Sequence, residues 1–326
     1  MKMNTKIFLF YLAITAMAIS SCQKDTDIFI PDTTSVGLDT NWVSAVIDLS
    51  PVNEVKRLLR KEIVVDSIDA AAGGTFQTAE GLTVTVSSNS LLLLNNQPAT
   101  GKIYVETLLI TQRGDMVRHD KPTTSFGRVL ISGGEVFIRL RKEKEELHLA
   151  PGKTISIKYN DSSPSSLMKL FYGDESNPER FNWLPTTLNS RDSVRVTSQG
   201  YEIVSERLRW INCDYFADSS GARMNIIASL PADFTNSNTS VYLVFKDIKS
   251  VVGMYGDALS KRFSSSKVPS GKIAVVISIT KKGNNSYYLG YQNITTGQTS
   301  LNGNQVVPLK PQPTSITDIK AYLSTL

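Results

Sequence analysis

Residues that could act as nucleophiles or acid–base catalysts are few in this chain. Its 326 residues include two histidines, His119 and His148, and two cysteines, Cys22 and Cys213. A hydrolase needs a base next to its nucleophile. His119 stands in a polar, turn-like stretch and His148 alternates with leucines, so we expect both histidines at the surface. The apolar neighbours of Cys213, among them Trp210, predict a buried small hydrophobe rather than a reactive thiol.

Motifs that would build a catalytic or metal site are also missing. The sequence contains no Gly-x-Ser-x-Gly, His-Glu-x-x-His or Gly-x-x-x-x-Gly-Lys pattern, which argues against the common hydrolase, zinc-protease and nucleotide sites. Two groups of acids could supply calcium ligands: Asp214 with Asp218, and Asp174 with Glu175 and Glu179. Neither group has the spacing Asp-x-Asp-x-Asp-Gly. The paired carboxylates of a glycosidase need no fixed spacing, but the acids here stand chiefly beside Lys or Arg. We therefore expect no enzyme activity, cofactor or metal.

Aromatic side chains are the remaining candidates for ligand contact, because sugar rings stack on flat aromatic faces. The candidate platform residues are Trp183, Tyr288 and Tyr291. Aromatic residues in strands usually belong to the core, which is the structural alternative. The two-residue period of a strand also requires at least one tyrosine of the segment 287–291 to face inward.

Short segments of alternating polar and apolar residues are expected to position these side chains. The alternation is clear in residues 82–86, 138–141 and 155–159, and it predicts half-buried antiparallel strands. Glycine pairs at 73–74 and 133–134 separate or interrupt such segments. They predict tight turns or bulges rather than a phosphate-binding loop.

Helices are predicted only near the two ends of the folded region. Ser50-Pro51 provides a cap and a first-turn proline for a short helix through Arg60. The spacing Ser315-x-x-Asp318 is that of a capping box, which predicts a short C-terminal helix lying on a sheet. Between them, Lys282-Gly-Asn-Asn285 predicts a hairpin turn.

The chain therefore divides into a leader, a tether and two β-rich regions. Residues 1–21 are the expected signal peptide and 22–48 a polar tether with too little apolar content to join the core. The first β-sandwich, with its short N-terminal helix, is expected over residues 49–160. A strand-bearing connector over 161–200 then leads to a second β-rich domain with a C-terminal helix over 201–326. The predicted fold class is mainly β, with two β-sandwich-like domains.

Several turn and strand segments of the first region resemble the ZU5-like β-sandwich found in uncharacterised surface lipoproteins of Bacteroidetes-type bacteria. These segments are Gly73-Gly74-Thr-Phe, Gly81-Leu-Thr-Val-Thr-Val86, Gly101-Lys-Ile-Tyr-Val105, Thr123-Thr-Ser125 and Ser132-Gly-Gly-Glu-Val-Phe137. The resemblance covers about residues 64 to 160 and implies an interaction or structural module. Some proteins of this fold cut themselves at a His-Phe-Ser step, and the sequence lacks that tripeptide.

The N-terminus has the pattern of an export signal. Lys2 and Lys6 precede a mostly apolar run over residues 7–19 that is too short to span a bilayer. The following Ile19-Ser20-Ser21-Cys22 resembles the lipobox of bacterial lipoproteins, which implies lipidation of Cys22. The polar residues 23–27 are similar to an export tag for the outer face of the outer membrane. Cell-surface exposure is therefore expected, with a periplasmic orientation as the alternative.

Charge and composition limit the partners. The full chain carries 35 basic and 30 acidic residues. Without Lys2 and Lys6 the balance is 33 minus 30, or +3, and the basic residues are scattered, which argues against nucleic acid. We expect membrane attachment through the N-terminal lipid and binding of an envelope protein or a glycan. The predicted function is a non-enzymatic interaction or structural module of the cell envelope; the alternative is a carbohydrate-binding surface lipoprotein in glycan uptake.

Overall fold

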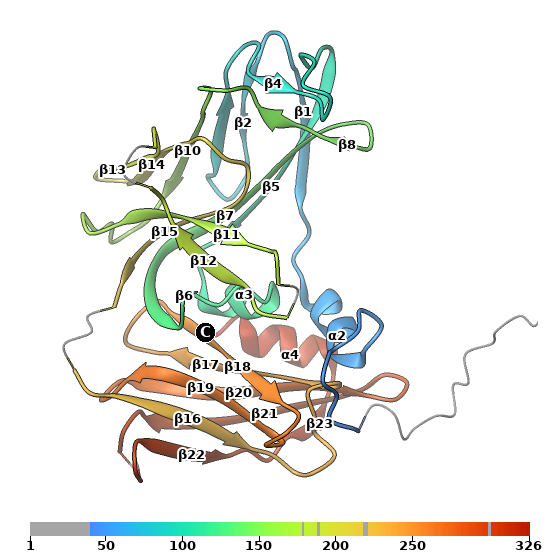
Figure 1. The fold of residues 1–326 in the computed structure, drawn as a ribbon, viewed down its shortest axis with the longest axis vertical. Helices are drawn as coiled ribbons and strands as arrows, with labels where there is room; N and C mark the ends of the chain where they lie inside the picture. Colours follow the sequence, from blue (N-terminus) through green and yellow to red (C-terminus); the bar gives the residue numbers. More distant parts are fainter. Residues whose placement is uncertain (1–39, 178, 188–189, 218–220, 299–300) are drawn as a thin grey trace, which may run out of the picture. The chain divides into compact units, whose positions relative to one another are not determined.

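A computed structural model gives the fold and describes residues 40–177, 179–187, 190–217, 221–298 and 301–326. Strands account for 50% of the structure and helices for 8%, which confirms the predicted mainly β fold class (Figure 1). In the described ranges, no helix combines the length and apolarity that a membrane crossing requires.

The first β-sandwich consists of two antiparallel sheets. Its large sheet runs in the order β1 (Val64–Asp69), β5 (Lys102–Ile110), β7 (Arg128–Lys142), β15 (Arg209–Phe216), β11 (Lys169–Asp174) and β12 (Asn182–Pro185), with β6 (Thr124–Ser125) and β8 (Glu145–Glu146) pairing with β7. Its small sheet runs in the order β13 (Ser193–Val196), β14 (Gly200–Ser205), β10 (Ile155–Asn160), β3 (Thr83–Val86) and β2 (Gly74–Gln77). The short strands β4 (Leu91–Leu92) and β9 (His148–Leu149) pair separately.

The alternating residues point as the sequence predicts. Val84 of β3 and Ile157 of β10 are buried against Ile138 and Leu140 of β7, in the core between the two sheets. Arg139 lies between Ile138 and Leu140 in β7, and its side chain points to the opposite face of the sheet, where it is partly exposed. The period of two therefore identified the inward face correctly.

The glycine pair at 133–134 is a bulge inside β7. The register with β15 shifts between Cys213 and Asp214, opposite the pair. Gly134 has φ +145°, and a Cβ there would lie 2.9 Å from the ring of Tyr159, while a Cβ on Gly133 would lie 2.9 Å from the carbonyl oxygen of Cys213. Only glycine fits this approach of two strands, so the predicted bulge is confirmed.

The sheet pairing moves the predicted border between the two β-rich regions. Residues 161–200, expected as a connector, contain β11, β12 and β13 of the first sandwich. Residues 201–216, expected in the second domain, form most of β14 and all of β15, which pair with β10 and β7. The sequence shows that these segments are strands, but strand partners depend on long-range packing. The first sandwich therefore ends at Phe216.

The second sandwich is one eight-stranded sheet that folds over. Its order is β22 (Asn304–Pro308), β16 (Arg223–Ser229), β19 (Arg262–Pro269), β18 (Val251–Asp257), β17 (Thr239–Phe245), β20 (Ile273–Lys282), β21 (Ser286–Thr295) and β23 (Gln312–Thr314). The pairing of Lys282 with Ser286 confirms the predicted hairpin.

The fold-over occurs at β18. Val251–Met254 pair with β17, whereas Tyr255–Asp257 pair with β19. Both halves of the sheet contribute to one apolar core, which includes Ile226 of β16 and Leu243 of β17. A strand shared by two halves in this way forms the corner of a sandwich.

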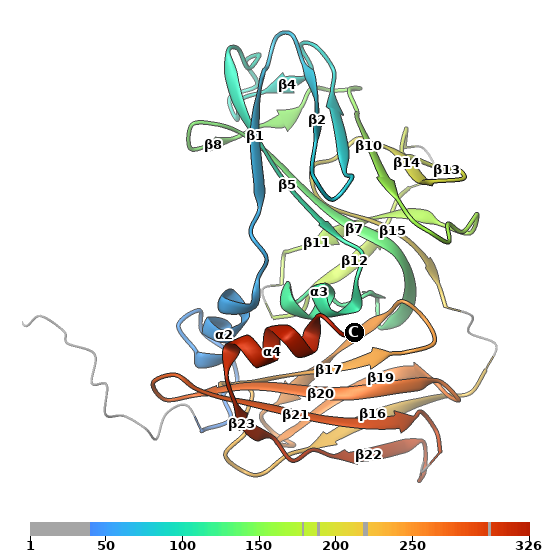
Figure 2. The same cartoon turned by 180° about the vertical axis from the view of Figure 1, so that it is seen from behind.

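Three short helices fill the space between the sandwiches (Figure 2). They are α2 (Pro51–Leu59), α3 (Arg113–Arg118) and α4 (Ile316–Leu323). Leu59, Met116 and Leu323, one from each helix, join a core that also holds Phe137 of the first sandwich and Ile277 of the second. We call this the shared core.

The two predicted helices appear where expected, but their caps differ. Ser315 accepts a hydrogen bond from the backbone N–H of Asp318 at 3.0 Å, as the capping box predicts. Ser50 makes no side-chain cap bond to α2. Helix α3 was not predicted, because six residues are too few to show a helical period.

Gly114→Ala tests the contact of α3 with α4. A Cβ at Gly114 would lie 1.7 Å from the carbonyl oxygen of Leu323. Helix propensity alone would favour alanine by about 1 kcal/mol, but this clash is expected to cost about 1–3 kcal/mol in the free energy of unfolding, measured by urea denaturation. Gly221→Ala is the control, since a Cβ there meets no atom of the described residues within 4 Å. Equal stability of both variants would contradict the described packing.

Candidate ligand-binding site

The structure does not bring the three predicted platform residues together. Trp183 is fully buried in the shared core, and its Nε1 donates a hydrogen bond to the carbonyl oxygen of Pro122 at 3.0 Å. Its proposed role as an exposed platform is therefore wrong, because its ring completes the packing between the sandwiches. Tyr288 and Tyr291 are three residues apart in β21 and so point to opposite faces of the sheet.

Tyr291 is the exposed member of the predicted set. The residue is 56% exposed, and its ring stacks on Tyr322 of α4, with centroids 5.0 Å apart. The two rings border a pocket of about 340 Å³, together with Arg113 and Asn293. Arg113 is not free to bind a ligand there, since its guanidinium donates to the carbonyl oxygens of Lys246, Ile248 and Leu326.

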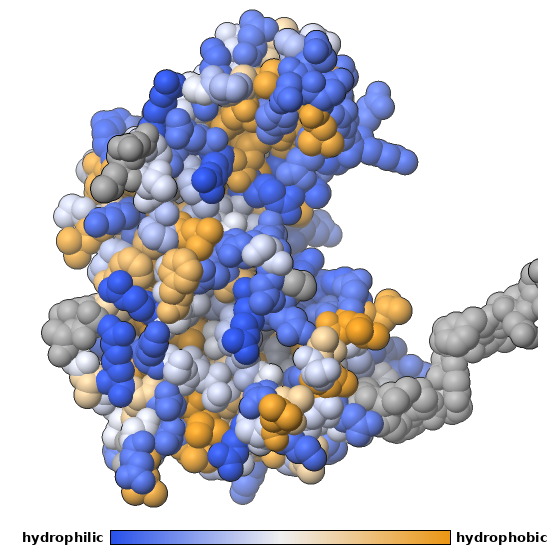
Figure 3. All heavy atoms as spheres, viewed as in Figure 1, coloured by the Kyte–Doolittle hydropathy of each residue, from blue (hydrophilic) through white to orange (hydrophobic). Residues whose placement is uncertain are grey.

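A larger pocket, of about 750 Å³, lies on the second sandwich. Its walls are the segment Thr40–Trp42, the outer side of β16 and β22, the loop after β16, and the β18–β19 turn. On the face drawn in Figure 3, hydrophilic and apolar residues are interspersed over the second sandwich, and no single apolar patch covers it. We call the pocket of about 750 Å³ the Trp42 pocket. Tyr288 adjoins it indirectly, because Tyr288 packs edge-on against the lining residue Phe234.

Trp42 is held in place by specific contacts. Its ring packs against Phe263, with centroids 5.0 Å apart. A Cβ at Gly256 would lie 3.0 Å from the Trp42 ring, so glycine makes room for the indole. The side chain of Asn236 accepts a hydrogen bond from the N–H of Val43 at 3.0 Å and donates one to its carbonyl oxygen at 2.7 Å.

This docking corrects part of the tether prediction. Residues 40–48 were assigned to a polar tether that stays outside the core, but Trp42 packs against the core of the second sandwich. The indole attaches this segment together with the hydrogen bonds of Asn236 to Val43 and that of the Val46 N–H to Glu179 at 2.8 Å. Trp42, a large apolar residue followed by Val43, Ala45, Val46 and Ile47, was the signal that could have identified this wall of the pocket.

Two cations border the Trp42 pocket without an acidic partner. Lys261 and Arg262 are both exposed, and within the described ranges neither side chain forms an ion pair or hydrogen bond. The nearest acid in the same turn, Asp257, is engaged elsewhere: its carboxylate accepts from the N–H of Leu259 at 3.0 Å and from the hydroxyl of Ser260 at 2.7 Å. The sequence analysis did not select either cation.

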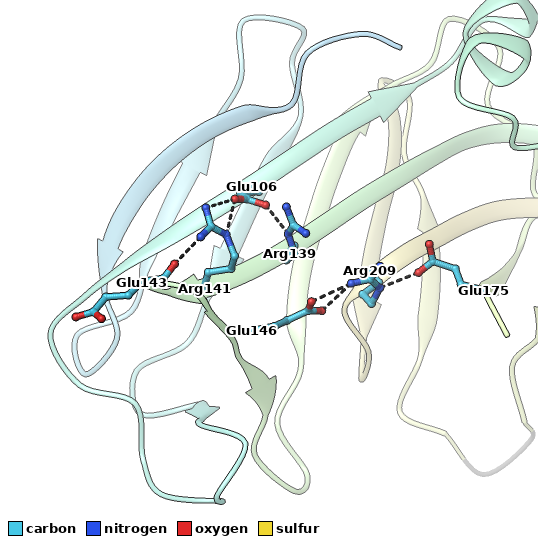
Figure 4. A network of polar contacts seen from close by, with 7 residues as sticks. All are labelled: Glu106, Arg139, Arg141, Glu143, Glu146, Glu175 and Arg209. Atoms are coloured by element: carbon cyan, nitrogen blue, oxygen red, sulfur yellow. Dashed lines mark hydrogen bonds and ion pairs between the residues drawn. The ribbon is translucent and has the colours of Figure 1, made fainter. Parts of the chain in front are cut away.

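Three arginines of the first sandwich, Arg139, Arg141 and Arg209, contrast with this pair, because each has an acidic partner. Glu106 accepts hydrogen bonds from Arg139 at 2.5 Å and from Arg141 at 2.6 Å, while Arg209 binds Glu146 and Glu175 (Figure 4). Burial raises the pKa of Glu106, but the two arginines outweigh burial and lower it below its usual value. We interpret this network as structural.

Two buried carboxyl groups, those of Glu135 and Asp214, lie beside the bulge. Burial, reinforced by Asp214, raises the pKa of Glu135 well above its usual value, and burial likewise raises that of Asp214. Both side chains are fully buried, so they favour their neutral forms and offer no surface to a ligand. Lys121, whose ammonium lies 3.8 Å from the ring centroid of Phe181, has its pKa lowered by burial to about 8.

His119 is buried, contrary to the expected surface position. Its Nε2 accepts a hydrogen bond from the backbone N–H of Lys61 at 3.1 Å. Burial and surrounding cations, beginning with Arg60, lower its pKa to about 3. The chain after α2 covers His119, a long-range contact that its polar sequence neighbours do not reveal. His148 is partly exposed, in agreement with the prediction.

The remaining candidates are buried, unassembled or outside the described ranges. Cys213 is fully buried, as predicted, and burial raises the pKa of its thiol. Cys22 and Asp218 lie outside the described residues. Among the residues that the structure describes, no three His, Cys, Asp or Glu side chains come together as a metal site.

The chain matches no protein family and no curated protein. Among solved structures, it is similar to the crystal structure of gamma-CGTase from Alkalophilic bacillus clarkii, with 11% sequence identity and a TM-score of 0.19. The similarity covers 73% of this chain and 41% of that chain. The chain therefore spans less than half of that protein, and a likeness at this score carries no argument about fold or function.

His119 should make the protein less stable in acid. The unfolded chain binds a proton at His119 near pH 6.5, whereas the folded chain does so only near pH 3. Lowering the pH through this window therefore favours unfolding, by at most about 1.4 kcal/mol per pH unit. His119→Gln should flatten this acid-side loss in thermal melts between pH 7 and pH 4.

His148→Gln is the matched control for this measurement. His148 is partly exposed and lies 3.2 Å from the side-chain oxygen of Asn96. The variant should keep the wild-type pH dependence. An unchanged pH dependence in His119→Gln would show that the folded protein does not hold His119 neutral.

Proposed function

We propose that this chain is a lipid-anchored protein of the cell envelope that acts as a non-enzymatic binding module. The observation that carries the proposal is the Trp42 pocket. One of its walls, residues 40–42, belongs to the segment between the predicted anchor and the folded region. A pocket of about 750 Å³ is of the size that small ligands occupy in proteins. The export pattern and the lipobox resemblance at Cys22 support the envelope location, and the outer membrane surface is the proposed site.

The first sandwich supports a scaffolding role in the same proposal. Its Arg–Glu network is engaged within the fold, and its buried acids Glu135 and Asp214 offer no surface to a ligand. The resemblance of residues 64 to 160 to ZU5-like regions adds the expectation of an interaction or structural module. The binding surface is therefore proposed on the second sandwich, and the first sandwich supports it through the shared core.

Cys22→Ala should abolish lipidation and release the protein from the membrane fraction without unfolding it. The reason is that Cys22 precedes the folded region by a polar segment, so anchoring and folding are energetically separate. Cys213→Ala should do the opposite: it leaves the protein membrane-bound but costs about 1–2 kcal/mol, because it removes a buried side chain. Fatty-acid labelling, fractionation and thermal melts measure both effects. Continued labelling of Cys22→Ala would refute the lipoprotein proposal.

Site-specific cross-linking tests the binding role. A photoreactive amino acid at Ser229, an exposed residue of the pocket wall, should give an envelope adduct in intact cells. Trp42→Ala should reduce that adduct, because the indole lines the same pocket. The same probe at Ser162, exposed on the first sandwich, is the control. Identical adducts from both positions, or an adduct that is indifferent to Trp42→Ala, would contradict the proposal.

A carbohydrate-binding role is the second candidate, favoured by the exposed face of Tyr291. Stacking on Tyr322 fixes the orientation of this ring, and a fixed aromatic face is what a sugar platform requires. Tyr291→Ala should lower binding on a glycan array by about tenfold if each stacking contact contributes about 1.4 kcal/mol. Tyr288→Ala, on the opposite face of β21, should leave binding unchanged. An array without signal for the wild type would remove this candidate.

A further inference from the structure

We infer that the Trp42 pocket binds an acidic saccharide, with the sugar rings against Trp42 and the acid group at Lys261 and Arg262. The inference rests on the proposed binding function and names the ligand class for that site. It follows from three features of the pocket: its charge, its mixture of side chains and its size.

The charge of the lining is unbalanced. Among the described residues that line the pocket, Lys261 and Arg262 are the only ionisable ones, and both are basic. Elsewhere on the second sandwich, lysines beside acids do find partners: Lys282 pairs with Asp233 at 2.5 Å, and Lys281 with Glu54 at 2.9 Å. A site with two cations and no acid favours an anionic ligand.

The turn that carries these cations occupies the acid closest to them in sequence, Asp257. Lys261 has φ +50°, a left-handed conformation at the end of the β18–β19 turn. Asp257 stabilises the same turn through its bonds to Leu259 and Ser260. Because the carboxylate is occupied by the turn, the two basic side chains remain available at the rim of the pocket.

The other lining residues suit a ring that carries hydroxyl groups. Trp42 is half-buried and provides an aromatic surface, while Ser229 is exposed and provides a hydroxyl on the adjoining strand. Val306, 57% exposed, adds an apolar contact from β22. Sugar rings have apolar faces and polar edges, and therefore match alternating aromatic, aliphatic and hydroxyl groups better than a purely apolar ligand would.

The number of cations limits the ligand further. Two basic residues can bind one or two acid groups, which is too few for the extended phosphate backbone of a nucleic acid. The volume of about 750 Å³ accommodates a short oligosaccharide rather than a single sugar. An oligosaccharide of uronic acids combines the rings, the hydroxyl groups and the carboxylates that this lining requires.

Titration calorimetry with trigalacturonic acid and with its fully methyl-esterified form tests the inference. The ester keeps the rings but removes the negative charges. The wild type should bind the acid at least about tenfold more tightly than the ester, and salt should weaken the binding of the acid. Quenching of Trp42 fluorescence, identified by its loss in Trp42→Ala, provides a second readout.

Two double variants localise the effect. Lys261→Gln with Arg262→Gln should weaken binding of the acid by about tenfold or more and abolish the preference over the ester. Arg223→Gln with Lys310→Gln is the control, because it removes the same charge from exposed positions of this sandwich outside the pocket. Equal loss in both double variants would overturn the inference, since only general attraction would then remain.

The outcome also separates this inference from the proposed function. Absence of binding to the acid, or equal binding of acid and ester, overturns the acidic saccharide as the ligand. If cross-linking from Ser229 still depends on Trp42 in that case, the binding module stands and its ligand belongs to another class. If cross-linking fails as well, the proposed function fails with the inference.

Discussion

The apolar layer between the two sandwiches is the constraint on which the rest of the structure depends. The large sheet of the first sandwich is apolar on both faces along part of its width: Ile138 faces the small sheet, while Phe137 faces the shared core. A sheet of this kind must be covered on both sides. Helices α2, α3 and α4 provide the second cover, although helices of six to nine residues are marginal alone and gain their stability from such burial.

The same layer determines where the candidate site lies. Helix α2 is fixed by Val55 and Leu59 in the shared core, and the N–H of Val52 donates to the carbonyl oxygen of Ser237 in the second sandwich. The segment before α2 is thereby led over the loop that contains Asn236, which binds Val43 on both sides of its peptide unit. The position of Trp42 is thus a consequence of the packing of α2, and the pocket depends on the shared core.

The charged groups of the first sandwich differ from those of the Trp42 pocket in whether they have partners within the fold. In the first sandwich, Glu106 pairs with two arginines, and the buried carboxyls of Glu135 and Asp214 favour their neutral forms. These groups satisfy or avoid charge within the fold. At the Trp42 pocket, Lys261 and Arg262 have no acidic partner among the described residues, because Asp257, the only acid in their turn, stabilises the turn itself. This unbalanced charge next to an aromatic wall is the feature on which the proposed binding surface rests.

The sequence by itself determined the class of fold, the inward faces of the strands and both predicted helices. These features depend on local periods and caps: alternation in β3, β7 and β10, the proline that opens α2, and the Ser315–Asp318 pair of α4. The bulge at Gly133 and Gly134 was equally predictable, because the need for glycine is local. The burial of Cys213 followed from its apolar neighbours.

Only the tertiary structure decided which strands are partners and which side chains share a surface. The pairing of β15 with β7 moved the border of the first sandwich to Phe216, and no local pattern specifies that pairing. Trp183 and His119 are buried by segments far away in the chain, so their neighbours in sequence misled the prediction. Trp42, Lys261 and Arg262 form one pocket although more than 200 residues separate the tryptophan from the cations. Such a site depends on packing free energy summed over distant contacts, which local propensities do not contain.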